Sequence, residues 1–182
     1  MKTISDHMLD IVQNSIRAHA TWIEVIFSEN KNCDIYQIKI IDNGCGMSKE
    51  LLNQAANPFF TSRSTRKVGL GLSLLKQNAE ASQGSVKIVS EPGKGTVVQA
   101  IFQHSHLDRP PLGDIWNVIY LLLVGNPTIR FSFRYQTEKG TFELDSTELL
   151  KLMDGIPIVQ QEVKNALIEY LKNNLKEIEA GI

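Results

Sequence analysis

Cysteine and long apolar runs are both scarce in the sequence. The 182 residues include only two cysteines, Cys33 and Cys45, and no CxxC pair, so we expect no disulfide framework. The longest apolar run, Ile115 to Val124, is interrupted by Asn117 and falls short of the roughly 20 residues that a bilayer span needs. The N-terminus has no basic segment followed by an apolar one. We therefore expect a cytoplasmic protein without membrane contacts.

The charges of the chain nearly cancel. With a formal net charge of −1, the sequence has no general excess of basic residues that would favour nucleic acid. Hydrophobic residues make up 42% of the chain, which is enough for a buried core. A chain of this length can form one large domain or two small ones.

Acidic residues are absent from residues 51–79, where every charged residue is basic. Pro58 and the hydroxyl residues that follow it predict a loop in the middle of this stretch. A mobile loop with basic and hydroxyl side chains suits a lid over a triphosphate, although a disordered surface loop has the same composition. The side chains concerned belong to Thr61, Ser62, Arg63, Ser64, Thr65, Arg66 and Lys67.

Periodicity predicts the remaining elements. A polar boundary at Asp108-Arg109-Pro110-Pro111 separates a first domain, residues 1–104, from a small α+β module, residues 110–182. The first two strands follow a helix directly, which suggests an antiparallel hairpin at one edge of a sheet. The predicted helices are 5–18 (with Ser5 or Asp6 as N-cap), 49–56, a helix ending near residue 82, 112–124, a helix with Ser146 as N-cap, and 160–178; the predicted strands are 22–27, 36–41, 86–90, 96–102, 129–135 and 141–144.

The first helix has a polar face opposite an apolar stripe. Asp10, Asn14 and Arg17 share that face because they lie four and three positions apart. They form either a solvated surface or a functional set. In the functional set Asp10 activates a water, Asn14 holds a metal ion and Arg17 contacts phosphate. Mg²⁺ suits such a site because it takes oxygen ligands and keeps several waters beside substrate phosphates.

A carboxylate and two glycines follow the second strand, in the sequence Asp42-Asn43-Gly44-Cys45-Gly46-Met47. Asn-Gly after a strand is a strong hairpin signal, so a simple turn is one interpretation. The other is a loop where the backbone passes close to a ligand, because glycine tolerates positive φ and close approach. The loop alone does not decide between them.

Two further glycine motifs follow. Gly69-Leu70-Gly71-Leu72 precedes a helix, where free N–H groups and the helix dipole favour an anion. It lacks the Gly-Lys-Ser/Thr ending of a Walker loop, and no strand directly precedes it as in a Rossmann motif. Gly93-Lys94-Gly95-Thr96 lies between two final strands and again combines flexible backbone with a hydroxyl.

Taken in order, these four motifs resemble those of the GHKL superfamily, which includes gyrase-type ATPases, heat-shock chaperone ATPases, histidine kinases and mismatch-repair ATPases. The resemblance covers residues 5–102. Residues 57–62 and 90–96 look most like histidine kinases. The resemblance to the superfamily implies a Bergerat-type α/β two-layer sandwich, in which a mixed sheet has helices on one face. In this fold ATP would be held between the helices and the lid.

The resemblance also implies roles for individual residues. Asp42 would accept a hydrogen bond from the adenine amino group with Thr96 nearby, Asn14 would coordinate Mg²⁺, and Asp10 would be the catalytic base. Asp10 is one methylene shorter than the glutamate of gyrase-type ATPases. The residues expected to bind the nucleotide are Asn14, Arg17, Asp42, Gly44, Gly46, Met47, Thr61, Arg63, Lys67, Gly69, Leu70, Gly71, Leu72 and Thr96.

Two histidine-containing segments are expected to lie outside this site. His7 falls within the first helix and is expected at the surface or near the helix cap. His104-Ser105-His106 is expected to be a polar junction after the last strand of the first domain. No helical hairpin with a phosphoacceptor histidine precedes the first helix, so the chain does not look like an autophosphorylating sensor kinase.

As a whole, the chain resembles small stand-alone histidine-kinase-like ATP-binding proteins of anaerobic bacteria, often encoded beside iron-only hydrogenase and NADH-linked flavoprotein subunits. This implies a regulatory or accessory role. The C-terminal module carries no catalytic constellation, so we expect it to bind an unidentified protein partner or to support a homodimer. We expect a regulatory kinase that phosphorylates a separate partner. The alternatives are an ATPase with Asp10 as base and a binding module gated by ATP without useful turnover.

Overall fold

The computed structural model describes residues 1–55 and 70–181. Within these residues, the first part of the chain forms three helices and four strands, and the second part forms three helices and two strands. In order these are α1 (Ile4–Arg17), β1 (Trp22–Asn30), β2 (Ile35–Asp42), α2 (Lys49–Ala55), α3 (Leu70–Ala81), β3 (Ser85–Glu91), β4 (Gly95–Gln103), α4 (Ile115–Gly125), β5 (Arg130–Gln136), β6 (Thr141–Asp145), α5 (Ser146–Leu152) and α6 (Gln161–Glu177).

All six strands belong to one mixed sheet with the order β3-β4-β2-β1-β5-β6. Neighbouring strands are antiparallel except β1 and β5, which are parallel. The expected β1–β2 hairpin is present, but its predicted place at a sheet edge is wrong. β5 covers the outer side of β1 and β4 covers the outer side of β2, so the hairpin lies inside the sheet.

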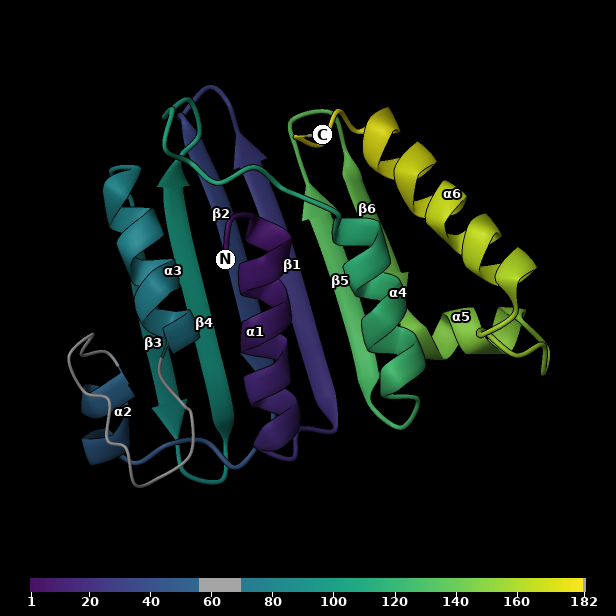
Figure 1. The fold of residues 1–182 in the computed structure, drawn as a ribbon, viewed down its shortest axis with the longest axis horizontal. Coiled ribbons are helices and arrows are strands. Elements are labelled where there is room, and N and C mark those ends of the chain that lie inside the picture. Colours follow the sequence, from purple (N-terminus) through teal and green to yellow (C-terminus); the bar gives the residue numbers. More distant parts are fainter. Residues whose placement is uncertain (56–69, 182) are drawn as a thin grey trace.

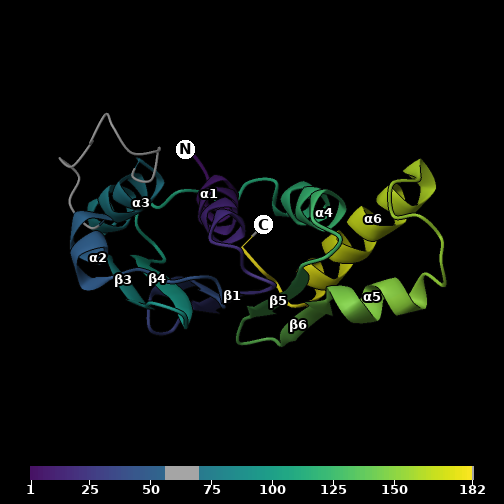
Figure 2. The same ribbon diagram turned by 90° about the horizontal axis from the view of Figure 1, so that it is seen from below.

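The helices α1, α3 and α4 lie over the same face of the sheet (Figures 1 and 2). Inward-facing residues alternate along β1, β2 and β4, as a sheet with one covered face requires. This arrangement confirms the predicted α/β sandwich with a mixed sheet and helices on one face. Among the described helices, none is both long and apolar enough to cross a bilayer.

The C-terminal part of the chain extends this sheet. Phe131, Phe133 and Tyr135 of β5 are buried, and α6 packs against α4. Strands from both sides of the predicted boundary near residues 104–110 pair in one sheet, β1 with β5. The division into two domains stays a prediction.

Two helix caps differ from the predicted ones. Thr3 begins α1 in a capping box with Asp6, in which each side chain accepts a hydrogen bond from the other residue's backbone N–H. Asp145, rather than Ser146, caps α5 by accepting from the Thr147 N–H. The Ser146 hydroxyl instead accepts from the Phe131 N–H at 2.9 Å.

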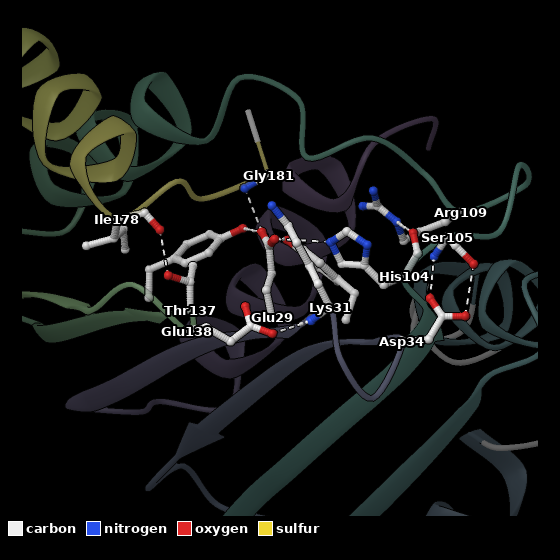
Figure 3. Close-up of polar contacts among 12 residues, drawn as sticks. Glu29, Lys31, Asp34, His104, Ser105, Arg109, Thr137, Glu138, Ile178 and Gly181 are labelled. Atoms are coloured by element: carbon white, nitrogen blue, oxygen red, sulfur yellow. Dashed lines mark hydrogen bonds and ion pairs between the residues drawn. The ribbon is translucent and has the colours of Figure 1, made fainter.

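A buried carboxylate connects the two parts of the chain at the opposite end of β1 from the Asp42 loop (Figure 3). Glu29 faces the core and is 3% exposed. It accepts hydrogen bonds from the Tyr135 hydroxyl and from the Gly181 N–H at 2.6 Å, and its other oxygen lies 3.2 Å from His104 Nε2. His104 is therefore part of a core cluster as well as of the predicted polar junction.

We expect Tyr135→Phe to lower the free energy of unfolding by about 1–3 kcal/mol, because it removes a donor from a buried carboxylate. Chemical denaturation monitored by circular dichroism measures this. Tyr170→Phe is the control, because Tyr170 is 48% exposed and should change stability by less than about 0.5 kcal/mol. Equal stability of the Tyr135→Phe variant and the wild type would contradict this account of the cluster.

His7 lies near the helix cap, since its N–H donates to the carbonyl of the N-cap residue Thr3, but the alternative that it lies at the surface is wrong. The His7 side chain lies on the side of α1 that contacts α3. It is 0% exposed, and its Nε2 lies 2.8 Å from Asn78 Nδ2 of α3. Within the described residues its Nδ1 has no hydrogen-bond partner. Burial lowers the pKa of His7 from 6.5 to about 4, because the charged imidazolium loses its hydration.

Because the pKa of His7 is lower in the folded protein, the folded state binds fewer protons than the unfolded state between about pH 4 and pH 6.5. Its stabilising effect is complete above pH 6.5 and is lost as the pH falls through this window, by about 1.4 kcal/mol per pH unit. We expect His7→Gln to flatten the decline in unfolding free energy between pH 6.5 and 5. His19→Asn, at an exposed histidine, is the control for replacing an imidazole that the core does not cover.

Candidate functional site

Three polar side chains form one row across the sheet. The register places Asp42 of β2 opposite Thr96 of β4, and Thr96 opposite Ser90 of β3. All three occupy the helix-facing positions of their strands. Asp42 contacts Ser15 of α1, and Ser90 contacts Met47 of the loop that follows β2. The sheet thus brings together two residues predicted for the nucleotide site and a third that was not predicted.

Asp42 is buried, with 7% of its surface exposed. Its Oδ1 accepts hydrogen bonds from the Gly44 N–H at 2.9 Å and the Thr96 N–H at 3.2 Å. Its Oδ2 accepts one from the Ser15 hydroxyl of α1 at 2.6 Å. A carboxylate has about four lone-pair positions, so Oδ2 retains the capacity to accept a hydrogen bond from a ligand.

The loop after Asp42 is not a hairpin turn, because β2 pairs with β1 and β4 and the chain continues into α2. Asn43 fixes the loop to the α1–β1 connection, where its Oδ1 accepts from the N–H groups of Thr21 and Trp22, both at 2.9 Å. The hairpin interpretation of the Asn-Gly pair is therefore wrong, and the asparagine has a structural role.

Gly46 and Gly95 allow this loop to pack closely against the β3–β4 turn. Both have positive φ, 66° and 97°. A Cβ atom on Gly46 would lie 1.9 Å from the Glu91 carbonyl oxygen, and one on Gly95 would lie 1.9 Å from the Asp42 carbonyl oxygen. Only glycine fits at either position. Met47 completes the contact, because its N–H donates to the Ser90 hydroxyl at 2.8 Å.

The polar face of α1 lies beside the start of α3. A Cβ atom added to Gly71 would meet Asp10 Oδ2 at 1.6 Å, so the Asp10 carboxylate lies directly against the α3 backbone. Asn14 and Arg17 follow on the same face, and the Arg17 guanidinium donates to Asn14 Oδ1 at 3.0 Å. The structure therefore brings Asp10, Asn14 and Gly71 to one region.

Helix α1 connects the two halves of the candidate site. Ser15, whose hydroxyl donates to Asp42, is five positions from Asp10, or about 7.5 Å along the helix axis. Leu70, Gly71 and Leu72 form the first turn of α3. Four predicted residues, Thr61, Arg63, Lys67 and Gly69, lie outside the described residues.

Asn14 fits the expected role of a magnesium ligand in its chemistry. It offers an amide oxygen, and the carboxylate of Asp10 is one helical turn away on the same face. When bound beside a nucleotide, Mg²⁺ neutralises phosphate charge. In this structure Asn14 Oδ1 accepts a hydrogen bond from the positively charged Arg17 guanidinium, which would have to move away for Mg²⁺ to bind at this oxygen.

Sequence reasoning missed Ser15 and Ser90. Ser15 interrupts the apolar stripe of α1 and is 3% exposed, so a polar residue at a core position was the signal that could have found it. Ser90 lies on an edge strand, and its role depends on the register between β3 and β4. No feature of the local sequence indicates that register.

Comparisons with known proteins agree with this geometry. The family described as histidine kinase-, DNA gyrase B-, and HSP90-like ATPase matches residues 3–106. The cell-division control histidine kinase PdhS of Brucella ovis is 34% identical over 116 residues, which cover 56% of this chain and 11% of that protein. Sporulation kinase C of Bacillus subtilis is 33% identical over 93 residues, covering 51% of this chain and 22% of that protein.

A solved structure also has a similar fold. The Aquifex aeolicus MutL ATPase domain complexed with ADP matches with a TM-score of 0.52 and 18% identity, over 85% of this chain and 68% of that chain. The chain thus spans less than a quarter of each of the two kinases, while the family match covers more than half of the chain. The protein belongs to the family of histidine kinase-, DNA gyrase B- and HSP90-like ATPases.

Proposed function

We propose that the protein binds Mg-ATP and transfers the γ-phosphoryl group to a hydroxyl or imidazole of a separate protein partner. The observation that carries this proposal is the buried Asp42 carboxylate. Its Oδ1 is saturated by two backbone N–H groups, while its Oδ2 keeps a free acceptor position. A buried acceptor with that geometry suits the amino group of adenine.

The phosphates would lie at the other end of α1, towards the N-terminus of α3. The N–H groups of Gly71 and Leu72 belong to the first turn of that helix, where the helix dipole favours an anion. Asn14 would hold Mg²⁺ through its amide oxygen, and Arg17 would contact phosphate oxygens. Thr61, Arg63, Lys67 and Gly69 remain proposed ligands from the lid.

Asp10 is the proposed catalytic base. It would accept the proton of the attacking group as the new bond to the γ-phosphorus forms and the bond to the bridging oxygen of ADP breaks. Its contact with Gly71 supports this role, because the α3 N-terminus is where the phosphates are expected. The names of the two kinases support transfer to a protein, whereas a water in the same place would make the protein an ATPase.

We expect Asp42→Asn to weaken ATP binding by about ten- to hundredfold, because the amide replaces a charged acceptor with a group that can turn its N–H₂ towards the adenine amino group. Isothermal titration calorimetry measures the dissociation constant. Asp108→Asn is the control for loss of a carboxylate, since the Asp108 side chain is 72% exposed. Wild-type affinity in Asp42→Asn would exclude Asp42 from the nucleotide site.

We expect Asp10→Asn to reduce phosphoryl transfer by at least about a hundredfold while ATP still binds, because a general base contributes a factor of this size. The assay incubates the purified protein with γ-labelled ATP and a host lysate. Glu24→Gln, on β1, is the matched control. Unchanged turnover in Asp10→Asn would remove Asp10 as the base.

The same assay separates the three candidate functions. A labelled partner band supports a protein kinase. Release of labelled phosphate without a labelled band supports an ATPase. ATP binding with neither product supports a binding module that ATP gates, and would contradict the transfer step proposed here.

A further inference from the structure

The Ser90 hydroxyl contacts three groups at the edge of the candidate nucleotide site. Its oxygen lies 2.8 Å from the Met47 nitrogen, 3.0 Å from the Gly95 carbonyl oxygen and 2.9 Å from Thr96 Oγ1. It therefore connects the loop after β2 to the β3–β4 turn and to the row that contains Asp42. Ser90 begins the stretch 90–96 that looks like histidine kinases, but the predicted site residues do not include it and no role was expected for it.

The number of available protons fixes the direction of these hydrogen bonds. A hydroxyl has one proton to donate and two lone pairs to accept with. The Met47 N–H can only donate, so Ser90 accepts there, and the Gly95 carbonyl can only accept, so Ser90 donates there. For all three contacts to exist together, the Thr96 hydroxyl must donate its proton to Ser90.

Thr96 then presents only lone pairs on its remaining side. Asp42, its neighbour in the row, is also an acceptor, because an ionised carboxylate has no proton to donate. Among the described side chains, the Thr96 hydroxyl oxygen and Asp42 Oδ2 then both offer acceptor positions, which match a ligand edge that carries hydrogens. The 6-amino group of adenine is such an edge, whereas a 6-oxo purine presents carbonyl lone pairs to the same two acceptors.

We propose that Ser90 determines specificity for the purine base, by holding the Thr96 hydroxyl so that it accepts from a 6-amino purine and does not donate to a 6-oxo purine. This inference rests on the proposed ATP site. Ser90 acts through Thr96 and is a positioning residue. Without the Ser90 hydroxyl the Thr96 proton is free to rotate towards the ligand, where it can pair with a 6-oxo group.

ATP and inosine triphosphate are the probes, because their bases differ only at the 6-position and in the N1 proton. Calorimetry with Mg²⁺ gives the ratio of the two dissociation constants. We expect Ser90→Ala to lower the preference for ATP by about three- to tenfold, the range that one neutral hydrogen bond contributes. Ser90→Thr keeps the hydroxyl and should keep the wild-type ratio. Ser85→Ala, an exposed serine on the same strand, is the matched control.

A double-mutant cycle separates positioning from a structural effect. In a Thr96→Val background, Ser90→Ala should change the ATP-to-inosine-triphosphate ratio no further, because the hydroxyl that Ser90 orients is gone. If Ser90→Ala left the ratio of the two dissociation constants unchanged, with or without an equal loss of affinity for both nucleotides, the role of Ser90 would be overturned. The proposed ATP site would still stand as long as the wild type binds ATP. Failure of the wild type to bind ATP would instead overturn the proposed function. If thermal melting shows that Ser90→Ala does not fold, Ser90→Cys, which is nearly isosteric but a weak donor, carries the same expectation.

Discussion

The candidate site depends on the burial of one charge, the carboxylate of Asp42. A buried carboxylate costs several kcal/mol unless donors replace its hydration, and three segments supply them here: α1 through Ser15, β4 through the Thr96 N–H and the loop through the Gly44 N–H. The same carboxylate therefore stabilises the meeting point of helix, sheet and loop. The proposed base-recognition site and the fold that positions it share this one interaction.

The sequence predicted most elements, and several of the residues that the structure brings together, because those features are local. The alternation of apolar residues located β1 and β2, and Asp42, Gly46 and Thr96 were recognisable from short motifs in a fixed order. A glycine in the sequence also indicates where the backbone needs a positive φ, as it does at Gly46. The helical period alone was enough to place Asp10, Asn14 and Arg17 on one face of α1.

The remaining features depend on contacts between distant parts of the chain. Nothing in the serine at position 90 reveals that β3 is in register with β4, and the inward position of Glu29 on β1 gives no hint of its partner Tyr135. The β1–β2 hairpin looked like a sheet edge because β5 joins it only through long-range parallel pairing. His7 looked exposed because histidine in a helix is usually solvated, whereas α3 buries this one.

The parallel pairing of β1 and β5 has a consequence for synthesis. Tyr135 and Glu29 are 106 residues apart, so the outer edge of β1 is left unpaired until the strand at 130–136 has left the ribosome. During that interval the nascent N-terminal part exposes a strand edge that can pair with another chain. Glu29 points towards the core near the end of β1, and until Tyr135 and Gly181 are synthesised its carboxylate lacks these two donors. An inward-pointing charge on an unpaired strand opposes pairing with another chain.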